Sequence, residues 1–518
     1  MDPSNTGAES LSEVAECWYV VSVMQNRAHH ISWFLALLLC ASFVQALEVR
    51  LVGDRVWLHA KEDPLVEVLR GFAHAGVRVR LDPEIEATVR GNVKDEPVES
   101  VLKRVLEPFG YVLLWDVIDG PIGRYPKLAE IQVFKPGQQD KMRQLAGVDD
   151  NFVVATGPDG RGPRFVADEV LIGFRVGTRR DDFERLIREI GGSVVDSVPG
   201  VGVYLVRLPP GSNILDLVAQ LKRNPLIAHV EPNYISEMGV PRRAAETAGS
   251  APMGMPPAPV KKGAVPVAVL DSGIRSLQGL SDMVLGTYDA VNPDREPDDR
   301  LGHGTQMAMI AAGLVSPHTC AADGPETGVP VLAIRAFDDN GNASTYSLMR
   351  SVSYAMEKGA RVLNMSWGSD TSSEFLEAAI RYAQKKGAVV VAAAGNRPTG
   401  QPVSPAAYSG VVAVSALDAD GGLWSQSNTG NFITFAAPGT ASFPVGYQGP
   451  PGAYAGTSIS SAFVARSLAL YFENNPQATA NDAVSALTSA VQVGGATGRD
   501  PRFGYGAVNA SAVSRLLR

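Results

Sequence analysis

Continuous apolar runs alternate with amphipathic segments through the second half of the chain. The runs are rich in Val, Ala and Leu, as strands buried on both faces are, and occupy 265–270, 331–337, 361–367, 388–394 and 411–417. Apolar residues recur with a helical period at 345–358, 373–386 and 459–473. Strands interleaved with helices predict an α/β fold, in which helices cover both faces of a parallel sheet. Functional groups in such sheets gather beyond the carboxyl ends of the strands.

Shorter elements predict two small α+β domains before this sheet. The first, 47–135, has strands expected at 49–51 and 56–59, and amphipathic helices expected at 65–72 and 98–109. The second, 165–237, has the expected order β-α-β-α-β, with elements at 169–176, 181–190, 202–208, 214–223 and 230–234.

The segment 238–262 separates these domains from a final domain at 263–518. It is rich in Pro, Ala and Gly and shows neither a helical nor a strand period. This composition predicts an extended, protease-accessible linker. A maturation cleavage would therefore fall within it.

A signal region is expected at residues 1–46, with the true start at Met24 and cleavage after Ala46. Arg27 precedes the apolar run 31–44, and small residues surround the cleavage point. A membrane anchor is the less favoured alternative, because the run is short for a bilayer. We therefore expect an exported protein, periplasmic or extracellular.

Cysteine content and charge narrow the class further. Cys17 and Cys40 precede the expected cut, so the exported protein keeps only Cys320 and forms no internal disulfide. A lipid on Cys40 is disfavoured, because Leu39 stands where lipoprotein signals need a small residue. The formal net charge of −8 gives no basic field for a phosphate backbone. Nucleic acid is not expected as a partner.

Three polar residues lie at positions where the expected sheet would place functional groups. Asp271 directly follows the strand 265–270, and His303 lies between two glycines before a small-residue helix. Ser458 follows Gly456-Thr457 at the start of another helix. Two of them have a plain structural explanation, which is a turn cap for Asp271 and a helix N-cap for Ser458.

The three residue types together meet the requirements of a nucleophilic serine. A serine hydroxyl needs a base to remove its proton, and the base needs a carboxylate to orient it. The chain order Asp, His, Ser is that of subtilisin, and it differs from the orders of chymotrypsin and the α/β-hydrolases.

The region from about 262 to 518 resembles the subtilisin-like serine proteases, or subtilases. Four blocks carry the resemblance: Val-Ala-Val-Leu-Asp-Ser-Gly-Ile at 267–274, Gly-His-Gly-Thr at 302–305, Val-Val-Val-Ala-Ala-Ala-Gly-Asn at 389–396 and Gly-Thr-Ser at 456–458. The resemblance implies a serine endopeptidase acting through an acyl-enzyme. In it, Asp271 would orient the imidazole, His303 would act as general base and then acid, and Ser458 would attack the scissile carbonyl.

The same resemblance assigns the oxyanion and substrate sites. Asn396, next to Gly395, would donate from its side chain to the oxyanion, together with the Ser458 backbone N–H. An ordinary turn asparagine is the alternative. Protein or peptide substrates would pair as an extra strand with Ser366-Trp367-Gly368 on one side and Asn342-Ala343-Ser344 on the other. Trp367 either narrows the subsites or packs in the core.

Two departures from the family pattern bear on the subfamily and on the rate of catalysis. The helix after Ser458 reads Ile-Ser-Ser-Ala-Phe-Val-Ala-Arg at 459–466, where the family usually has Met-Ala-x-Pro-x-Val-Ala-Gly. Gln306 stands where a second histidine is common. A catalytically inactive subtilase fold used for binding is therefore an alternative hypothesis.

The two small domains also resemble known modules. Residues 165–237 resemble the inhibitory propeptide of subtilases, of the fervidolysin type, which implies a zymogen whose own pro-domain masks the site. The pattern at 63–69, 79–81, 91–93 and 110–113 resembles the short N-terminal domain of secretins and TonB-dependent receptors. That resemblance implies an envelope protein as partner, and a third hypothesis is that this N-terminal domain provides the main function of the chain.

The acidic run at 294–299 is the one candidate for a cation site. Asp294, Glu296, Asp298 and Asp299 show no ligand spacing typical of calcium, so a solvated loop is the expected structure. We expect no metal and no cofactor.

Overall fold

The structure is a computed structural model that describes residues 47–145, 151–157, 159–244, 260, 263–320, 328–491 and 498–518. The expected signal region 1–46, with Cys17, Met24 and Cys40, lies outside the described residues, as does most of the linker. In the described part, no helix is long and apolar enough to cross a membrane.

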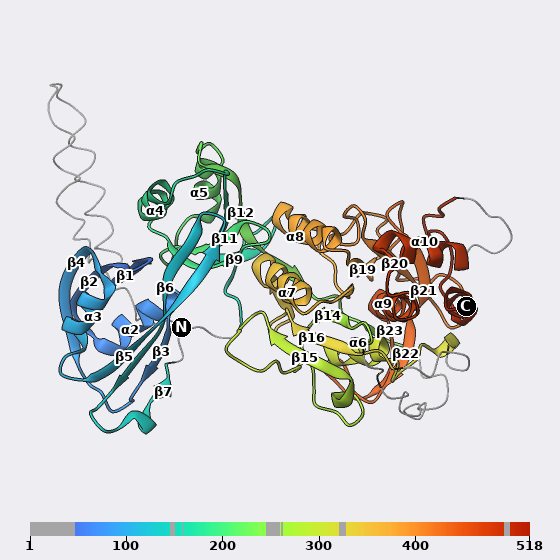
Figure 1. The fold of residues 1–518 in the computed structure, drawn as a ribbon, viewed down its shortest axis with the longest axis horizontal. Coiled ribbons are helices and arrows are strands. Elements are labelled where there is room, and N and C mark those ends of the chain that lie inside the picture. The colour runs from blue at the N-terminus through green and yellow to red at the C-terminus, as the bar shows by residue number, and fades with distance from the viewer. Residues whose placement is uncertain are drawn as a thin grey trace, which may run out of the picture. The chain divides into compact units, whose positions relative to one another are not determined.

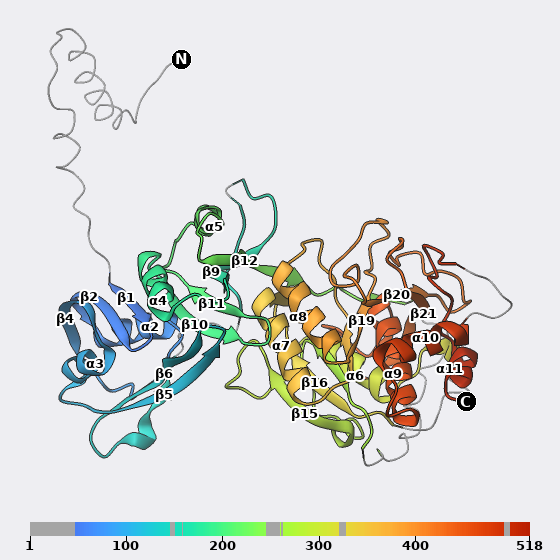
Figure 2. The same cartoon turned by 45° about the horizontal axis from the view of Figure 1, so that its top comes forward.

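A seven-stranded sheet forms the core of the C-terminal half (Figures 1 and 2). Every neighbouring pair is parallel. The strand order is β15 (Val284–Asp289), β16 (Val331–Arg335), β14 (Val267–Asp271), β18 (Val362–Met365), β19 (Val389–Ala393), β20 (Val412–Leu417) and β21 (Phe435–Pro438). The chain enters the sheet at β14 and then builds it outward on both sides. β14 is therefore the switch strand, where a parallel sheet opens a crevice at its carboxyl edge.

Helices cover both faces of this sheet, so the expected fold class is confirmed. Side chains of β14 alternate between two apolar clusters, with Val267 and Val269 in one and Ala268 and Leu270 in the other. The first cluster includes α6 (His303–Ala312), α9 (Thr457–Asn474), α10 (Ala480–Val491) and α11 (Ala510–Leu516). The second includes α7 (Thr345–Glu357) and α8 (Glu374–Lys385).

Several elements of this half have no counterpart in the expected pattern. They are β15, β21, α10, α11 and the antiparallel pair β22 (Thr440–Phe443) and β23 (Gly452–Ala455). β15 and β21 are the edge strands of the large sheet. The edge position explains why β15 lacks a continuous apolar run, since most of its residues are only partly buried.

Residues 165–237 form a separate antiparallel sheet with two helices. Its elements are β9 (Phe165–Phe174), α4 (Arg180–Glu189), β10 (Ser193–Val198), β11 (Val203–Arg207), α5 (Ile214–Leu221) and β12 (Ile227–Glu237), and β8 (Val154–Ala155) pairs with β9. The expected order β-α-β-α-β is wrong by one strand, because β10 forms a hairpin with β11. Three of the six residues of β10 are polar, so the pattern of apolar residues did not predict this strand.

The N-terminal unit contains two sheets packed with two helices. Strands β1 (Glu48–Val52), β2 (Arg55–Pro64) and β4 (Thr88–Pro97) form one, and β5 (Gly110–Gly120), β6 (Gly123–Phe134), β3 (Arg78–Leu81) and β7 (Arg143–Gln144) form the other. Helices α2 (Leu65–His74) and α3 (Val98–Leu106) supply apolar residues to one cluster with these strands. α3 ends three residues before the expected Phe109, because Pro108 disfavours a helical conformation at Glu107.

The expectation that 238–262 lacks regular structure is wrong for its first residues. Met238 is buried, and β13 (Arg242–Arg243) pairs antiparallel with β23. Similarly, β17 (Asn342–Ser344) pairs antiparallel with the end of β12. These pairs form because β17 and β23 offer unpaired backbone groups that an extended chain can satisfy.

Candidate active site

The carboxyl end of the switch strand β14 delivers Asp271 to the sheet edge. Its Oδ1 accepts a hydrogen bond from Nδ1 of His303 at 2.7 Å and another from the Ser272 backbone N–H at 2.8 Å. His303 is the first residue of α6, and both side chains are almost completely buried. A carboxylate bonded to one imidazole nitrogen fixes the tautomer and leaves the other nitrogen to act as a base.

Two opposing effects set the pKa of His303. Burial lowers the pKa, because the charged imidazolium loses its hydration. The Asp271 carboxylate raises it through its charge and its hydrogen bond, and the net pKa is raised from the ordinary 6.5. The imidazole therefore accepts a proton at a higher pH than a free histidine does.

The carboxylate of Asp299 holds the start of α6 in place. Its Oδ1 accepts from the Gly302 N–H and the Ser272 hydroxyl, both at 2.7 Å. Its Oδ2 accepts from the Thr305 N–H at 2.8 Å and from the Thr305 hydroxyl at 2.6 Å. A negative charge is favourable at a helix N-terminus, where backbone N–H groups lack partners within the helix. Asp299 therefore positions His303 through the backbone around it.

The expectation of a solvated acidic loop at 294–299 is wrong for Asp299, which is fully buried. Asp298 is largely exposed, and Asp294 forms an ion pair with Arg78. In the described ranges, no group of three or more His, Cys, Asp or Glu side chains could hold a metal ion. Sequence reasoning missed the role of Asp299, although its position four residues before His303 was a usable signal.

Close backbone approach explains why glycine adjoins His303. A Cβ added at Gly304 would lie 2.3 Å from the Gly273 carbonyl oxygen, in the turn that follows Asp271. Gly273 itself has φ +118°, and a Cβ there would lie 2.2 Å from the Asp298 carbonyl oxygen. These contacts bring the Asp271 turn and the first turn of α6 within hydrogen-bonding distance of each other.

Ser458 lies in the first turn of α9. The residue in the N-cap position is Gly456, so the N-cap explanation for Ser458 is wrong. The Ser458 hydroxyl donates to the Ser366 carbonyl oxygen at 3.0 Å. Among the described residues, Nε2 of His303 has no hydrogen-bond partner. The nucleophile candidate and the base candidate are therefore not bonded to each other in this structure.

The amide of Asn396 has a defined orientation. Its Oδ1 accepts from both the N–H and the hydroxyl of Thr457, each at 2.9 Å, and the Gly395 N–H donates to the Thr457 hydroxyl at 3.1 Å. Because Oδ1 is occupied, Nδ2 is the group that faces the Val240 carbonyl oxygen, 3.5 Å away. Thr457 is thus an orienting residue that sequence reasoning did not single out, although it adjoins Ser458.

The expected substrate segments differ in their surroundings. Asn342, Ala343 and Ser344 form β17, which lies beside β12 of the preceding domain. Trp367 is 2% exposed and packs edge to face on Phe337, with ring centroids 5.9 Å apart. Trp367 is therefore core packing rather than a subsite wall, which was the other alternative. Ser366 accepts the Ser458 hydroxyl, and Gly368 lies against Val403.

The departures in α9 and at Gln306 fit their surroundings. Gln306 is fully buried, and its Nε2 donates to the Val445 carbonyl oxygen at 2.7 Å. Ser460 donates to the Ala437 carbonyl oxygen, and Ser461 donates to that of Ser458, both at 2.9 Å. Burial lowers the pKa of Arg466 to about 10. The unusual helix is therefore packed into the core without displacing Ser458 from its first turn.

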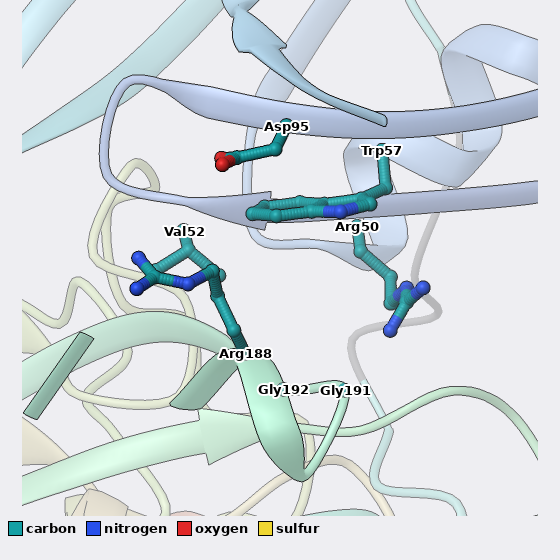
Figure 3. A pocket seen from close by; sticks show the side chains of 7 residues that line it. All are labelled: Arg50, Val52, Trp57, Asp95, Arg188, Gly191 and Gly192. Atoms are coloured by element: carbon teal, nitrogen blue, oxygen red, sulfur yellow. The ribbon is translucent and has the colours of Figure 1, made fainter. Parts of the chain in front are cut away.

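A pocket elsewhere in the described chain involves none of these residues (Figure 3). It is lined by Arg50, Val52, Trp57, Asp95, Arg188, Gly191 and Gly192. Figure 3 shows Trp57 and Asp95 above Arg188 and the two glycines. The residues described above lie instead at the carboxyl edge of the large sheet, where parallel sheets open a crevice.

Comparisons with known proteins agree with this geometry. The model of the subtilase family matches residues 262–506, and that of the fervidolysin N-terminal prodomain matches residues 154–233. The thermophilic serine proteinase of Bacillus sp. (strain AK1) is 32% identical over 322 residues, which cover 59% of this chain and 78% of that protein. Thermitase of Thermoactinomyces vulgaris is 34% identical over 200 residues, which cover 38% of this chain and 71% of thermitase.

A solved structure shares the fold. Fervidolysin from Fervidobacterium pennivorans, described as a keratinolytic enzyme related to subtilisin, superposes with a TM-score of 0.55 at 22% identity. The match covers 71% of this chain and 63% of that one. With the relative from strain AK1 covered over more than two thirds of its length, the chain belongs to the subtilase family of serine endopeptidases.

Proposed function

We propose that Asp271, His303, Ser458 and Asn396 form the catalytic site of an exported protease that is made as a zymogen. The observation that carries this proposal is the buried 2.7 Å hydrogen bond between Asp271 and His303 at the edge of the switch strand. Ser458 at the start of α9 and Asn396, three residues after the end of β19, would supply the remaining groups.

In the proposed mechanism, Nε2 of His303 removes the proton of the Ser458 hydroxyl as Oγ attacks the peptide carbonyl carbon. This requires the hydroxyl to turn from the Ser366 carbonyl to Nε2, since catalytic hydrogen bonds often form only in the substrate complex. Nδ2 of Asn396 and the Ser458 N–H then stabilise the oxyanion. The imidazolium gives its proton to the leaving amine, and water hydrolyses the acyl-enzyme.

Protein chains are the proposed substrates. β17 is a short strand whose backbone pairs with the extended residues 235–237 of β12, and a substrate would use the same backbone groups. Gly368 and Gly395 would leave room for its main chain on the other side. Main-chain pairing of this kind tolerates many side chains.

The domain at 165–237 is the proposed intramolecular inhibitor. Glu231 accepts hydrogen bonds from the Ser373 hydroxyl and the Glu374 N–H at the N-terminus of α8. Asn233, two residues along the same strand, accepts from the Tyr346 N–H in the first turn of α7 at 2.9 Å. Two helix N-termini of the peptidase are thus bonded by one strand of the pro-domain, and the same strand runs on to the cleft.

The remaining proposals concern export and domain bounds. We retain 1–46 as signal region, 47–135, 165–237 and 263–518 as domains, and 238–262 as linker. The basic residue Arg27 before the apolar run 31–44 supports export. The resemblance of the first domain to secretin and TonB N-terminal modules supports an envelope protein as its partner.

Replacement of Asp271 tests the catalytic base. With wild type, kcat/KM for an added peptide should fall as the pH drops through the raised pKa of His303, because only the neutral imidazole removes a proton. Asp271→Asn removes the cause of that rise, so the inflection should move to lower pH, and kcat should fall roughly 10⁴-fold. Both proteins are first cut by trypsin at the exposed Arg242–Arg243, so that they are compared in one form. Asp282→Asn, an exposed carboxylate, is the control, and an unchanged inflection in Asp271→Asn contradicts the assignment.

Replacement of Ser458 tests the nucleophile and the zymogen. Wild type should shorten on storage by cleavage within 238–262 and should react with a fluorophosphonate probe. Ser458→Ala should stay full length and unlabelled, because it has no hydroxyl to attack. Identical full-length bands contradict self-processing, and absence of labelling in wild type favours the inactive binding fold. Ser467→Ala, another buried serine of α9, is the matched control.

Removal of the Glu231 carboxylate, which accepts hydrogen bonds from Ser373 and Glu374 at the start of α8, should weaken inhibition by the pro-domain. In Glu231→Ala the interface loses about 1 kcal/mol, so the cut pro-domain should bind about fivefold more weakly. The measurement is the lag before full peptidase activity after trypsin has cut the linker, and it should shorten. Glu189→Ala, an exposed carboxylate of α4, should leave the lag unchanged. An equal lag in Glu231→Ala and wild type means that this contact does not contribute to inhibition.

Cell fractionation tests export. Ser458→Ala, which keeps its domains joined, should appear in the periplasm or the medium with Leu47 as its first residue. A deletion of 31–44 should keep it in the cytoplasm, because the apolar run is the export signal. Cross-linking of the exported protein should then recover an envelope protein. Full-length chain confined to the cytoplasm contradicts the proposal.

A further inference from the structure

The chain that follows β12 is held on both sides of the cleft. On the first side, Glu237 pairs with Asn342, and the Met238 N–H donates to the Gly341 carbonyl oxygen at 2.8 Å. On the second side, Arg242 pairs with Ala455 of β23, three residues before Ser458. Only the three residues 239–241 lie between these two anchors.

The second anchor extends beyond Arg242. Arg243 pairs with Tyr454, and its guanidinium donates to the Pro451 carbonyl oxygen at 3.3 Å. The Ala244 N–H donates to the Ala453 carbonyl oxygen at 3.0 Å. Because strand pairing fixes register, the residues between the anchors cannot slide along the cleft without breaking these bonds.

The carbonyl group at the middle of this span is that of Val240. Its oxygen faces Nδ2 of Asn396 at 3.5 Å, and the side chain of Val240 is largely exposed. The Gly239 backbone also lies beside this amide, since a Cβ on it would be 3.8 Å from Nδ2. The oxygen that Asn396 faces marks the carbonyl carbon that the serine would attack. The bond after that carbon joins Val240 to Pro241, and Pro241 is buried.

A proline nitrogen is a poor leaving group in this geometry. When the C–N bond of a tetrahedral intermediate breaks, the nitrogen must take a proton from Nε2 of the protonated imidazole. Most residues carry a hydrogen and Cα on that nitrogen, whereas proline carries Cα and the ring carbon Cδ. Cδ occupies space next to the nitrogen that the imidazole has to approach. The intermediate then returns to the intact amide more readily than it breaks down.

We infer that the Val240–Pro241 bond occupies the position of the scissile bond and that Pro241 keeps it uncut, so that the pro-segment inhibits as a bound substrate that is not turned over. The inference rests on the proposed catalytic roles of Ser458 and Asn396.

The inference also determines how the linker is cut. With 238–244 in its own site, a molecule cannot place a later linker bond there as well. Cleavage in wild type therefore takes place beyond residue 244, in the site of a second molecule whose own segment 238–244 has left it. Its rate should increase with the square of the protein concentration.

Replacement of Pro241 by Ala tests the register. Ser458 Oγ would attack the Val240 carbon, the proton would pass through His303 to the nitrogen of the new alanine, and the C–N bond would break. Water would then hydrolyse the ester to a Val240 carboxylate and restore Ser458. Access of the general acid is worth about 10²-fold or more, so Pro241→Ala should cut itself about that much faster than wild type, at a rate independent of concentration. N-terminal sequencing should find residue 241 first.

Three controls make the outcome decisive. Pro252→Ala, in the same linker, should process like wild type. Pro241→Ala combined with Ser458→Ala should remain intact, which excludes other proteases. Thermal unfolding of that double variant beside Ser458→Ala reports whether the alanine disturbs the fold.

The failures of the two proposals are distinguishable. If the Pro241→Ala chain reacts with a fluorophosphonate probe at Ser458 but is cut elsewhere or no faster, the register is wrong while the catalytic assignment stands. Wild type cut after Val240, with Pro241 as the new first residue, also overturns the inference. If no variant reacts with the probe, the catalytic proposal itself fails.

Discussion

The hydrogen bond between Asp271 and His303 sets the constraint that the rest of the peptidase domain meets. Both groups are buried, and the residues are 32 positions apart in the chain, so two elements have to be fixed independently to make one 2.7 Å contact. β14 fixes the carboxylate because it lies inside the sheet with a neighbour on each side. Asp299 fixes the imidazole by bonding the first backbone groups of α6. A buried carboxylate is costly unless such bonds compensate it.

The pro-domain and the cleft are connected through one strand. β12 bonds the N-termini of α7 and α8 through side chains and pairs with β17 through its backbone. A helix N-terminus with unbonded N–H groups and a strand edge with unpaired backbone are both incompletely satisfied surfaces. Both kinds of surface are good docking points for the pro-domain, and β17 is also the strand proposed to pair with substrates. The proposed inhibition would therefore use, at β17, backbone groups that are also proposed to bind substrates.

The sequence was sufficient for the large sheet because its inner strands are buried on both faces and read as unbroken apolar runs. It was insufficient where an element is half exposed or polar, as in β15 and β10. Among the proposed site residues, Asp271, His303 and Ser458 follow from motif and chain order. Asp299 and Thr457 do not, because their function is to bond backbone or an amide, and only the folded contacts reveal that. The start of the linker was mistaken for free chain for the same reason, since its partner β23 lies about 200 residues further along the chain.

The state of the Ser458 hydroxyl links the site to its occupant. The hydroxyl has one proton and two nearby acceptors in the proposed mechanism, the Ser366 carbonyl and Nε2 of His303. With the first, the serine is a poor nucleophile; with the second, it is activated. With an ordinary leaving amine the imidazole takes part in two proton transfers, whereas we propose that the ring carbon Cδ of Pro241 hinders the second. In this structure the Val240 carbonyl oxygen faces Asn396, and the Ser458 hydroxyl donates to the Ser366 carbonyl oxygen at 3.0 Å. On this proposal, the identity of residue 241 alone separates a bound segment from a substrate.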